Sequence, residues 1–143
     1  MFIGEYTHTI DEKRRLAIPS KFRSALGKKA VITRGLENCL VLYPLNEWTV
    51  LAEKLASLPT SREEARSFTR LMLAGAMDTV LDSLGRILIP DYLKKYAALE
   101  KNVAIIGLGD RIEIWDEKRW QEYKAKTETR VEDIAEKLEE LGI

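Results

Sequence analysis

The sequence contains the same pattern twice, and this internal repeat is the strongest constraint on its fold. DEKRRLAIP at residues 11–19 aligns with DSLGRILIP at residues 82–90 at an offset of 71, with Asp, Arg, an aliphatic residue, Ile and Pro in register. After one inserted residue the offset is 72, and VITRGL at 31–36 aligns with VAIIGL at 103–108. Two copies are too few for a solenoid. We therefore expect residues 1–143 to form one pseudo-twofold unit in which each half completes the core of the other.

Each copy is predicted to consist mainly of short strands, because its apolar runs are short and rich in β-branched and aliphatic residues. Two strands that flank a polar turn predict an opening hairpin in each copy, and two further strands predict a second hairpin. The expected strands are 5–10, 16–18, 31–33 and 40–43 in the first copy, and 77–81, 87–89, 103–106 and 111–115 in the second.

Helices are predicted after the second hairpin of each copy, which makes the fold class α+β. Asn46 and Asp116 are placed to act as N-caps, and Ser61 and Glu64 have the spacing of a capping box. After Thr129, apolar residues recur at a spacing of three to four with acidic residues between them, as in an amphipathic helix. The predicted organisation is a first repeat at 5–47, a helical connector at 48–75, a second repeat at 76–119 and a C-terminal amphipathic helix at 120–143.

The single cysteine and single histidine among 143 residues limit the chemistry that this chain can carry out. Cys39 alone cannot form a disulfide framework or a Cys-rich zinc site, and with His8 alone no catalytic triad is available. We therefore expect no enzyme activity, no cofactor and no metal. No apolar run reaches the roughly 18 residues of a membrane span, and the N-terminal residues lack the apolar stretch of a signal peptide, so a cytoplasmic location is expected.

The net charge is zero, but the charges are unevenly distributed along the chain. Residues 1–35 hold eight Lys or Arg against three acidic residues, a balance of +5. Residues 110–143 hold seven basic against eleven acidic residues, a balance of −4. Such asymmetry indicates either a polyanion partner for the N-terminal part or simply a well-solvated surface.

The polar turn between the first two strands is Asp-x-x-Arg-Arg in the first copy and Asp-x-x-Gly-Arg in the second. Asp11 and Asp82 can accept backbone N–H groups across the turn, and Gly85 can take a positive φ. Arg15 and Arg86 then leave the turn on a strand. A two-stranded ribbon fits the major groove of DNA, where Arg binds guanine or phosphate. Alternatively, each Asp–Arg pair is a surface ion pair with a stabilisation of at most about 1 kcal/mol.

The occurrence of the same turn twice favours a DNA-binding role over two coincidental ion pairs. Additional cations surround the first turn, namely Lys13, Arg14, Lys21 and Arg23. We expect Lys13, Arg14 and Lys21 to add contacts to DNA phosphates.

Four segments of the sequence resemble the bacterial MraZ family over essentially the whole chain. They are MFIGEYTHTIDEKRRLAIPSKFR, TRGLENCLVLYPLNEW, RSFTR and DSLGRILIP. The resemblance implies two AbrB-like halves with swapped hairpins in a double-psi-type β-barrel, and a ring-like homo-oligomer. It also implies a nucleoid-associated transcriptional regulator, expected to be a repressor. The implied site is a set of repeated boxes upstream of the division and cell-wall gene cluster.

The family's DNA-contacting motif, Asp-x-x-Gly-Arg, falls on residues 11–15 and 82–86, and this assigns Arg15 and Arg86 as the DNA contacts. The first copy departs from the motif because Arg14 stands where the family has Gly. A non-Gly residue in the left-handed region costs about 1–2 kcal/mol, so the turn either changes shape or tolerates the strain. The alternative function is a ring-forming structural or adaptor protein that does not bind DNA.

Overall fold

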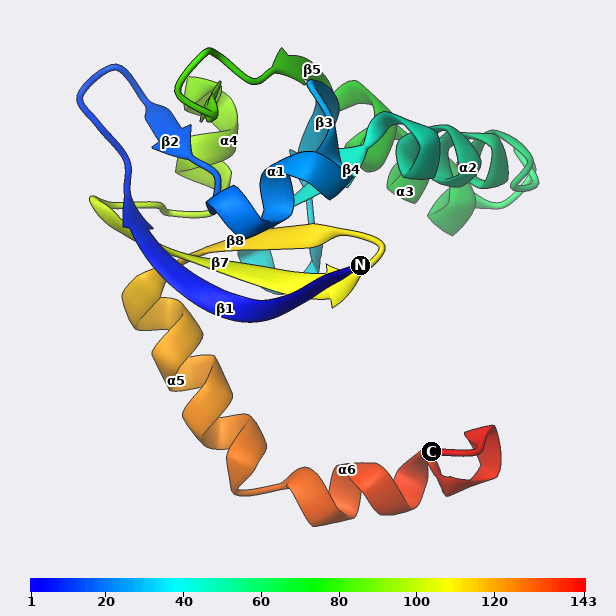
Figure 1. Ribbon diagram of the computed structural model, residues 1–143. Coiled ribbons are helices and arrows are strands. Elements are labelled where there is room, and N and C mark those ends of the chain that lie inside the picture. The colour runs from blue at the N-terminus through cyan, green and yellow to red at the C-terminus, as the bar shows by residue number, and fades with distance from the viewer.

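The computed structural model describes residues 1–143 as two antiparallel sheets with helices attached (Figure 1). The strands are β1 (Phe2–Thr9), β2 (Arg15–Ala17), β3 (Lys29–Arg34), β4 (Leu40–Pro44), β5 (Met77–Val80), β6 (Arg86–Leu88), β7 (Asn102–Gly109) and β8 (Ile112–Asp116). The helices are α1 (Ser20–Leu26), α2 (Leu45–Ala56), α3 (Glu63–Ala74), α4 (Asp91–Tyr96), α5 (Glu117–Glu128) and α6 (Val131–Lys137), with 3₁₀ turns η1 (Leu36–Asn38) and η2 (Glu139–Leu141). The mixed α+β class agrees with the prediction.

The strand pairs join the two copies of the repeat to each other. The larger sheet has the order β1-β7-β8-β4-β3-β5, and the smaller sheet consists of β2 and β6. The first strand of each copy therefore pairs with a strand of the other copy, β1 with β7 and β5 with β3. The predicted second hairpins are present as β3–β4 and β7–β8.

The prediction of an opening hairpin in each copy is wrong. β1 does not form a ladder of hydrogen bonds with β2, and β5 does not form one with β6. β2 spans three residues and pairs with β6 instead. A single bridge, Ile10 to Leu16, links the ends of β1 and β2. Only the turns between these strands have hairpin geometry. No strand pair joins β1 to β5, so closure into a double-psi-type barrel stays a prediction, as do the repeat boundaries 5–47, 48–75 and 76–119.

One hydrophobic core is built from equivalent positions of both copies. Leu16 and Ile87 are buried, as are Ile18 and Ile89, and each pair lies 71 residues apart in the sequence. Twenty buried residues form this cluster, to which β1, β3, β4, β7 and β8 also contribute. The ribbon of β2 and β6 is therefore anchored to the core through its inner face.

Two short helices, α1 and α4, were not predicted from the sequence. Each follows directly after Pro19 or Pro90, whose fixed φ of −49° or −58° suits a helix start. Two predicted caps are also wrong. Because α2 begins at Leu45, Asn46 lies inside its first turn, and α3 begins beyond Ser61 with no side-chain cap.

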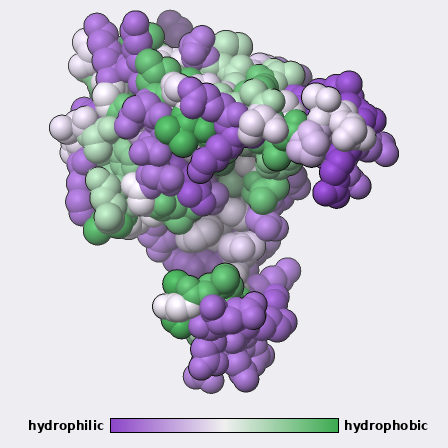
Figure 2. Space-filling model, turned by 90° about the vertical axis from the view of Figure 1, so that its right-hand side faces the viewer, coloured by the Kyte–Doolittle hydropathy of each residue, from purple (hydrophilic) through white to green (hydrophobic).

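The C-terminal part is two helices in place of the single helix predicted at 120–143. α5 begins at Glu117, where the predicted cap Asp116 accepts a hydrogen bond from the N–H of Arg119 at 3.4 Å, and it ends at Glu128 before α6 starts. α6 extends away from the sheets, and its surface shows both hydrophobic and hydrophilic residues (Figures 1 and 2). None of the helices is both long and apolar enough to cross a lipid bilayer.

Candidate nucleic-acid interface

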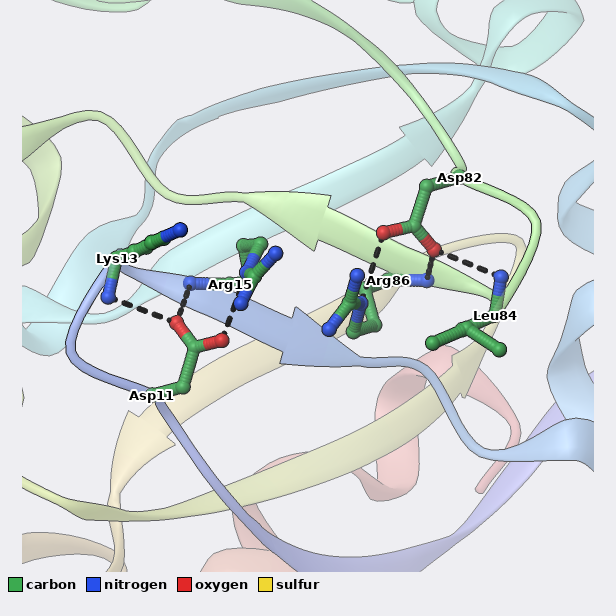
Figure 3. A network of polar contacts seen from close by, with 6 residues as sticks. All are labelled: Asp11, Lys13, Arg15, Asp82, Leu84 and Arg86. Carbon is green, nitrogen blue, oxygen red and sulfur yellow. Dashed lines mark hydrogen bonds and ion pairs between the residues drawn. The ribbon is translucent and has the colours of Figure 1, made fainter.

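The first turn is organised by the carboxylate of Asp11 (Figure 3). Its Oδ1 accepts the backbone N–H groups of Lys13 and Arg15 at 2.9 and 2.8 Å, and its Oδ2 accepts Nε of Arg15 at 2.7 Å. The backbone N–H of Asp11 donates to the carbonyl of Arg15 at 3.0 Å, which closes the turn. One side chain therefore fixes both the backbone of the turn and the direction of the guanidinium.

The second turn repeats this network atom for atom. Asp82 Oδ1 accepts the N–H groups of Leu84 and Arg86, both at 2.9 Å, and Oδ2 accepts Nε of Arg86 at 2.8 Å. The N–H of Asp82 donates to the carbonyl of Arg86 at 2.9 Å. In both turns, the aspartate carboxylate therefore holds the backbone of the turn through two N–H groups.

The pairing of β2 with β6 brings the two arginines to one surface. In the ribbon, Arg15 lies opposite Leu88 and Ala17 lies opposite Arg86, so the arginines are diagonal neighbours. Diagonal neighbours in an antiparallel pair are about 7–8 Å apart. Figure 3 shows both side chains above the ribbon, between their aspartate partners. Two turns that are 71 residues apart in sequence thus present their guanidinium groups on one surface.

The ion pairs leave hydrogen-bond donors of both arginines free. The side chains of Arg15 and Arg86 are 35% and 27% exposed. Each binds its aspartate through Nε, and the Nη1 and Nη2 groups make no hydrogen bond within the chain. Those groups are the donors that bind guanine or phosphate in a bidentate manner. Surface ion pair and DNA contact are therefore compatible roles here.

The first turn keeps the shape of the second although Arg14 replaces glycine. Arg14 has φ 61° and Gly85 has φ 74°. Their carbonyls accept equivalent bonds across the ribbon, from Ile89 to Arg14 at 2.8 Å and from Ile18 to Gly85 at 2.9 Å. The strain at Arg14 is therefore tolerated, and the side chain itself donates to the Ile89 carbonyl at 3.2 Å.

Arg23 contacts the second turn, whereas its place in the sequence suggested the first. Its Nε donates to the Ile18 carbonyl at 2.9 Å, and a Cβ on Gly85 would lie 2.2 Å from that Nε. Gly85 is thus required both for its positive φ and for the space that Arg23 occupies. The position of Arg23 could not be predicted because α1, which carries it, was not.

The remaining predicted cations lie on the first turn and on the helix that follows β2. Lys13 is exposed at the first turn, and Lys21 is exposed on α1. Neither side chain makes an ion pair, so both are free to attract an anion. A shallow hollow beside the second turn is lined by Arg23, Lys28 and Asp82 among others, and Lys28 is a further exposed cation that the sequence analysis did not select.

The turn hydrogen bonds make the carboxyl groups more acidic, which gives a pH prediction. The backbone N–H of Arg15 is the main group that lowers the pKa of Asp11 below 3.8, and the N–H of Arg86 does the same for Asp82. Because both pKa values are lower in the folded state, their stabilisation is present above the unfolded pKa and lost as pH falls through the folded values. Carboxyl titration by NMR should place both pKa values below 3.8.

A second measurement checks the linkage directly. The Asp11→Asn/Asp82→Asn variant is expected to have a free energy of unfolding that depends less on pH than the wild type between roughly pH 5 and pH 2. Identical pH profiles for the two proteins would contradict the prediction.

Comparison with known proteins places the chain in one family. The family model described as "MraZ protein, putative antitoxin-like" matches twice, at residues 1–71 and 72–140. The chain is 53% identical to a protein of Caldicellulosiruptor saccharolyticus, 51% to one of Halothermothrix orenii and 50% to one of Acetivibrio thermocellus, each over 143 residues and the full length of both chains. All three are named "Transcriptional regulator MraZ". With the repeat matched in both halves, the chain belongs to the MraZ family.

Proposed function

We propose that this chain is a transcriptional regulator that binds duplex DNA in a sequence-specific manner through Arg15 and Arg86. Arg14, Lys13 and Lys21 add phosphate contacts at the edge of the surface. The regulator acts as a repressor at repeated boxes upstream of the division and cell-wall gene cluster. It works in the cytoplasm at the nucleoid, as a ring-like homo-oligomer of swapped-hairpin units. The names of its relatives support the transcriptional role.

The convergence of two identical Asp–Arg networks on one ribbon is the observation that carries the proposal. A structural ion pair requires neither the repetition nor a shared surface. A DNA reader requires both, because two base contacts from one chain must reach the same groove. The aspartates hold each guanidinium in place before binding, which reduces the entropy lost on association.

A neutral chain can bind DNA tightly if several copies act together. One chain offers about two to five phosphate contacts, which corresponds to a slope of about −2 to −5 in a plot of log K against log salt. Several chains in one assembly bind neighbouring boxes with a high effective concentration, without new contacts per chain. The exposed apolar residues of α6 and η2, among them Val131 and Leu141, are candidates for contacts between copies.

The salt dependence of DNA binding tests this function. A duplex is first selected by the wild-type protein from a random pool, and its affinity is measured by gel shift at several salt concentrations. We expect a slope steeper than a single chain allows, roughly beyond −5. The matched control is Lys54→Ala, which removes one exposed charge from α2, on the far side of the molecule from β2 (Figure 1). This variant should keep the wild-type slope.

The adaptor alternative gives the opposite result in the same assay. A ring-forming protein without DNA binding would sediment as an oligomer but pass through a DNA column at low salt. No salt-dependent retention of any duplex would therefore reject the proposed function, whatever the oligomeric state.

A further inference from the structure

Two leucines are exposed on the surface that carries the arginines. Leu16 and Ile87 form the buried pair in the middle of the ribbon, so the residues on either side of them point outward. The outward residues of β6 are Arg86 and Leu88, and Leu88 is 52% exposed. At the second turn, the side chain of Leu84 is 61% exposed and lies at the end of the ribbon (Figure 3). Neither leucine side chain takes part in the Asp–Arg networks, which use only the backbone N–H of Leu84.

The equivalent positions of the first copy do not carry large apolar side chains. At an offset of 71, Leu84 corresponds to Lys13 and Leu88 corresponds to Ala17. Because Leu88 lies opposite Arg15, the first-turn end of the surface carries Lys13 and Leu88, whereas the second-turn end carries Leu84 and the smaller Ala17. Because the backbone of the two turns is the same, this difference lies in the side chains alone.

The C5-methyl group of thymine is the apolar group that bases expose in the major groove. Leu88 lies directly opposite Arg15 in the register, so a base read by Arg15 has a large apolar side chain beside it. Cations at Lys13, Arg15 and Arg86 favour a polyanion over an apolar partner at this surface. When DNA is bound at these cations, an apolar side chain between them lies close enough to the duplex to contact a thymine methyl group.

We propose that Leu84 and Leu88 are specificity-determining residues that pack against thymine methyl groups next to the bases contacted by the arginines. This inference rests on the proposed function. Its consequence is a directional site, because the second-turn end offers Leu84 to a thymine, whereas the first-turn end combines Leu88 with the phosphate-binding cation Lys13. Each chain then binds its box in one orientation, and the boxes need not be palindromic.

Replacement of thymine by deoxyuridine tests the proposal, since it removes only the methyl group. The thymines of the selected duplex are replaced one at a time, and affinities for the wild type and for Leu84→Ala/Leu88→Ala are measured by gel shift. The wild type should lose roughly fourfold in affinity for each contacted methyl. The double variant should bind both duplexes with equal affinity, while Leu36→Ala, which truncates a 67% exposed leucine in η1, should discriminate as the wild type does.

Three results would overturn the inference. The wild type could bind the uracil and thymine duplexes equally, the discrimination could survive in the double variant, or the selected duplex could contain no thymine. If the double variant changes the sedimentation coefficient and leaves methyl discrimination intact, the leucines belong to a contact between copies. Tight, salt-dependent binding without methyl discrimination would reject this inference and leave the proposed function standing. Absence of any DNA binding would reject both.

Discussion

The variant Arg15→Ala/Arg86→Ala is expected to bind the selected duplex about 2–6 kcal/mol more weakly than the wild type. A side chain that reads a base contributes about 1–3 kcal/mol, and two such contacts on different bases add approximately. The loss corresponds to a factor of at least about 30 in affinity, which gel shift or fluorescence anisotropy measures directly. The fold should persist, because a surface ion pair stabilises by at most about 1 kcal/mol.

Lysine variants separate base reading from simple charge. Arg15→Lys/Arg86→Lys keeps both positive charges but cannot form the planar bidentate contact to guanine. We expect this variant to retain non-specific binding and to lose preference for the selected duplex over a scrambled one. If the alanine variant binds the selected duplex as tightly as the wild type, the two arginines are not the DNA contacts.

Truncation of Leu16 to alanine is expected to lower the free energy of unfolding by about 2–5 kcal/mol. Leu16 is fully buried and pairs in register with Ile87, which is also buried. Removal of its side chain leaves a cavity beneath the ribbon that carries both arginines. Since a domain is stable by only about 5–15 kcal/mol, the loss is a large fraction of the total.

Urea denaturation followed by tryptophan fluorescence measures this loss. Leu36→Ala is a matched control, because it removes the same atoms from a largely exposed side chain and should change stability by less than about 0.5 kcal/mol. Equal midpoints for the two variants would show that the inner face of the ribbon does not contribute to the core.

Comparison of the two copies predicted much of the fold, whereas the choice of strand partners was not predictable. The family model matches at residues 1–71 and 72–140, which reproduces the offset found between the copies. Composition and the alternation of side chains indicate that a segment such as Phe2–Thr9 is a strand, but they do not specify the strand with which it pairs. Its pairing with β7 depends on tertiary packing. At Gly107, a Cβ would lie 2.5 Å from the backbone of β1, so the close approach of these strands requires glycine there.

The candidate site was predicted where local chemistry determines structure. An aspartate followed four residues later by an arginine in a short turn has few other partners, and both carboxylates accept the backbone N–H of that arginine. The contact between Arg23 and Gly85 joins residues that are 62 positions apart, so no short sequence motif predicts it. Leu88 could have been noticed, since it shares the alternation of Arg86, but its exposure depends on the pairing of β6 with β2.

The pairing of β1 with β7, β5 with β3 and β2 with β6 has an evolutionary consequence. Two identical half-length chains could form all three pairs between them, as a symmetric dimer. In such an ancestor, every substitution in one turn would also occur in the other. A single chain that carries both halves lacks that coupling, and Arg14 and Gly85 are different residues in equivalent places. Covalent linkage of the halves thus allows the two turns to differ in sequence while the pairing between the halves stays the same.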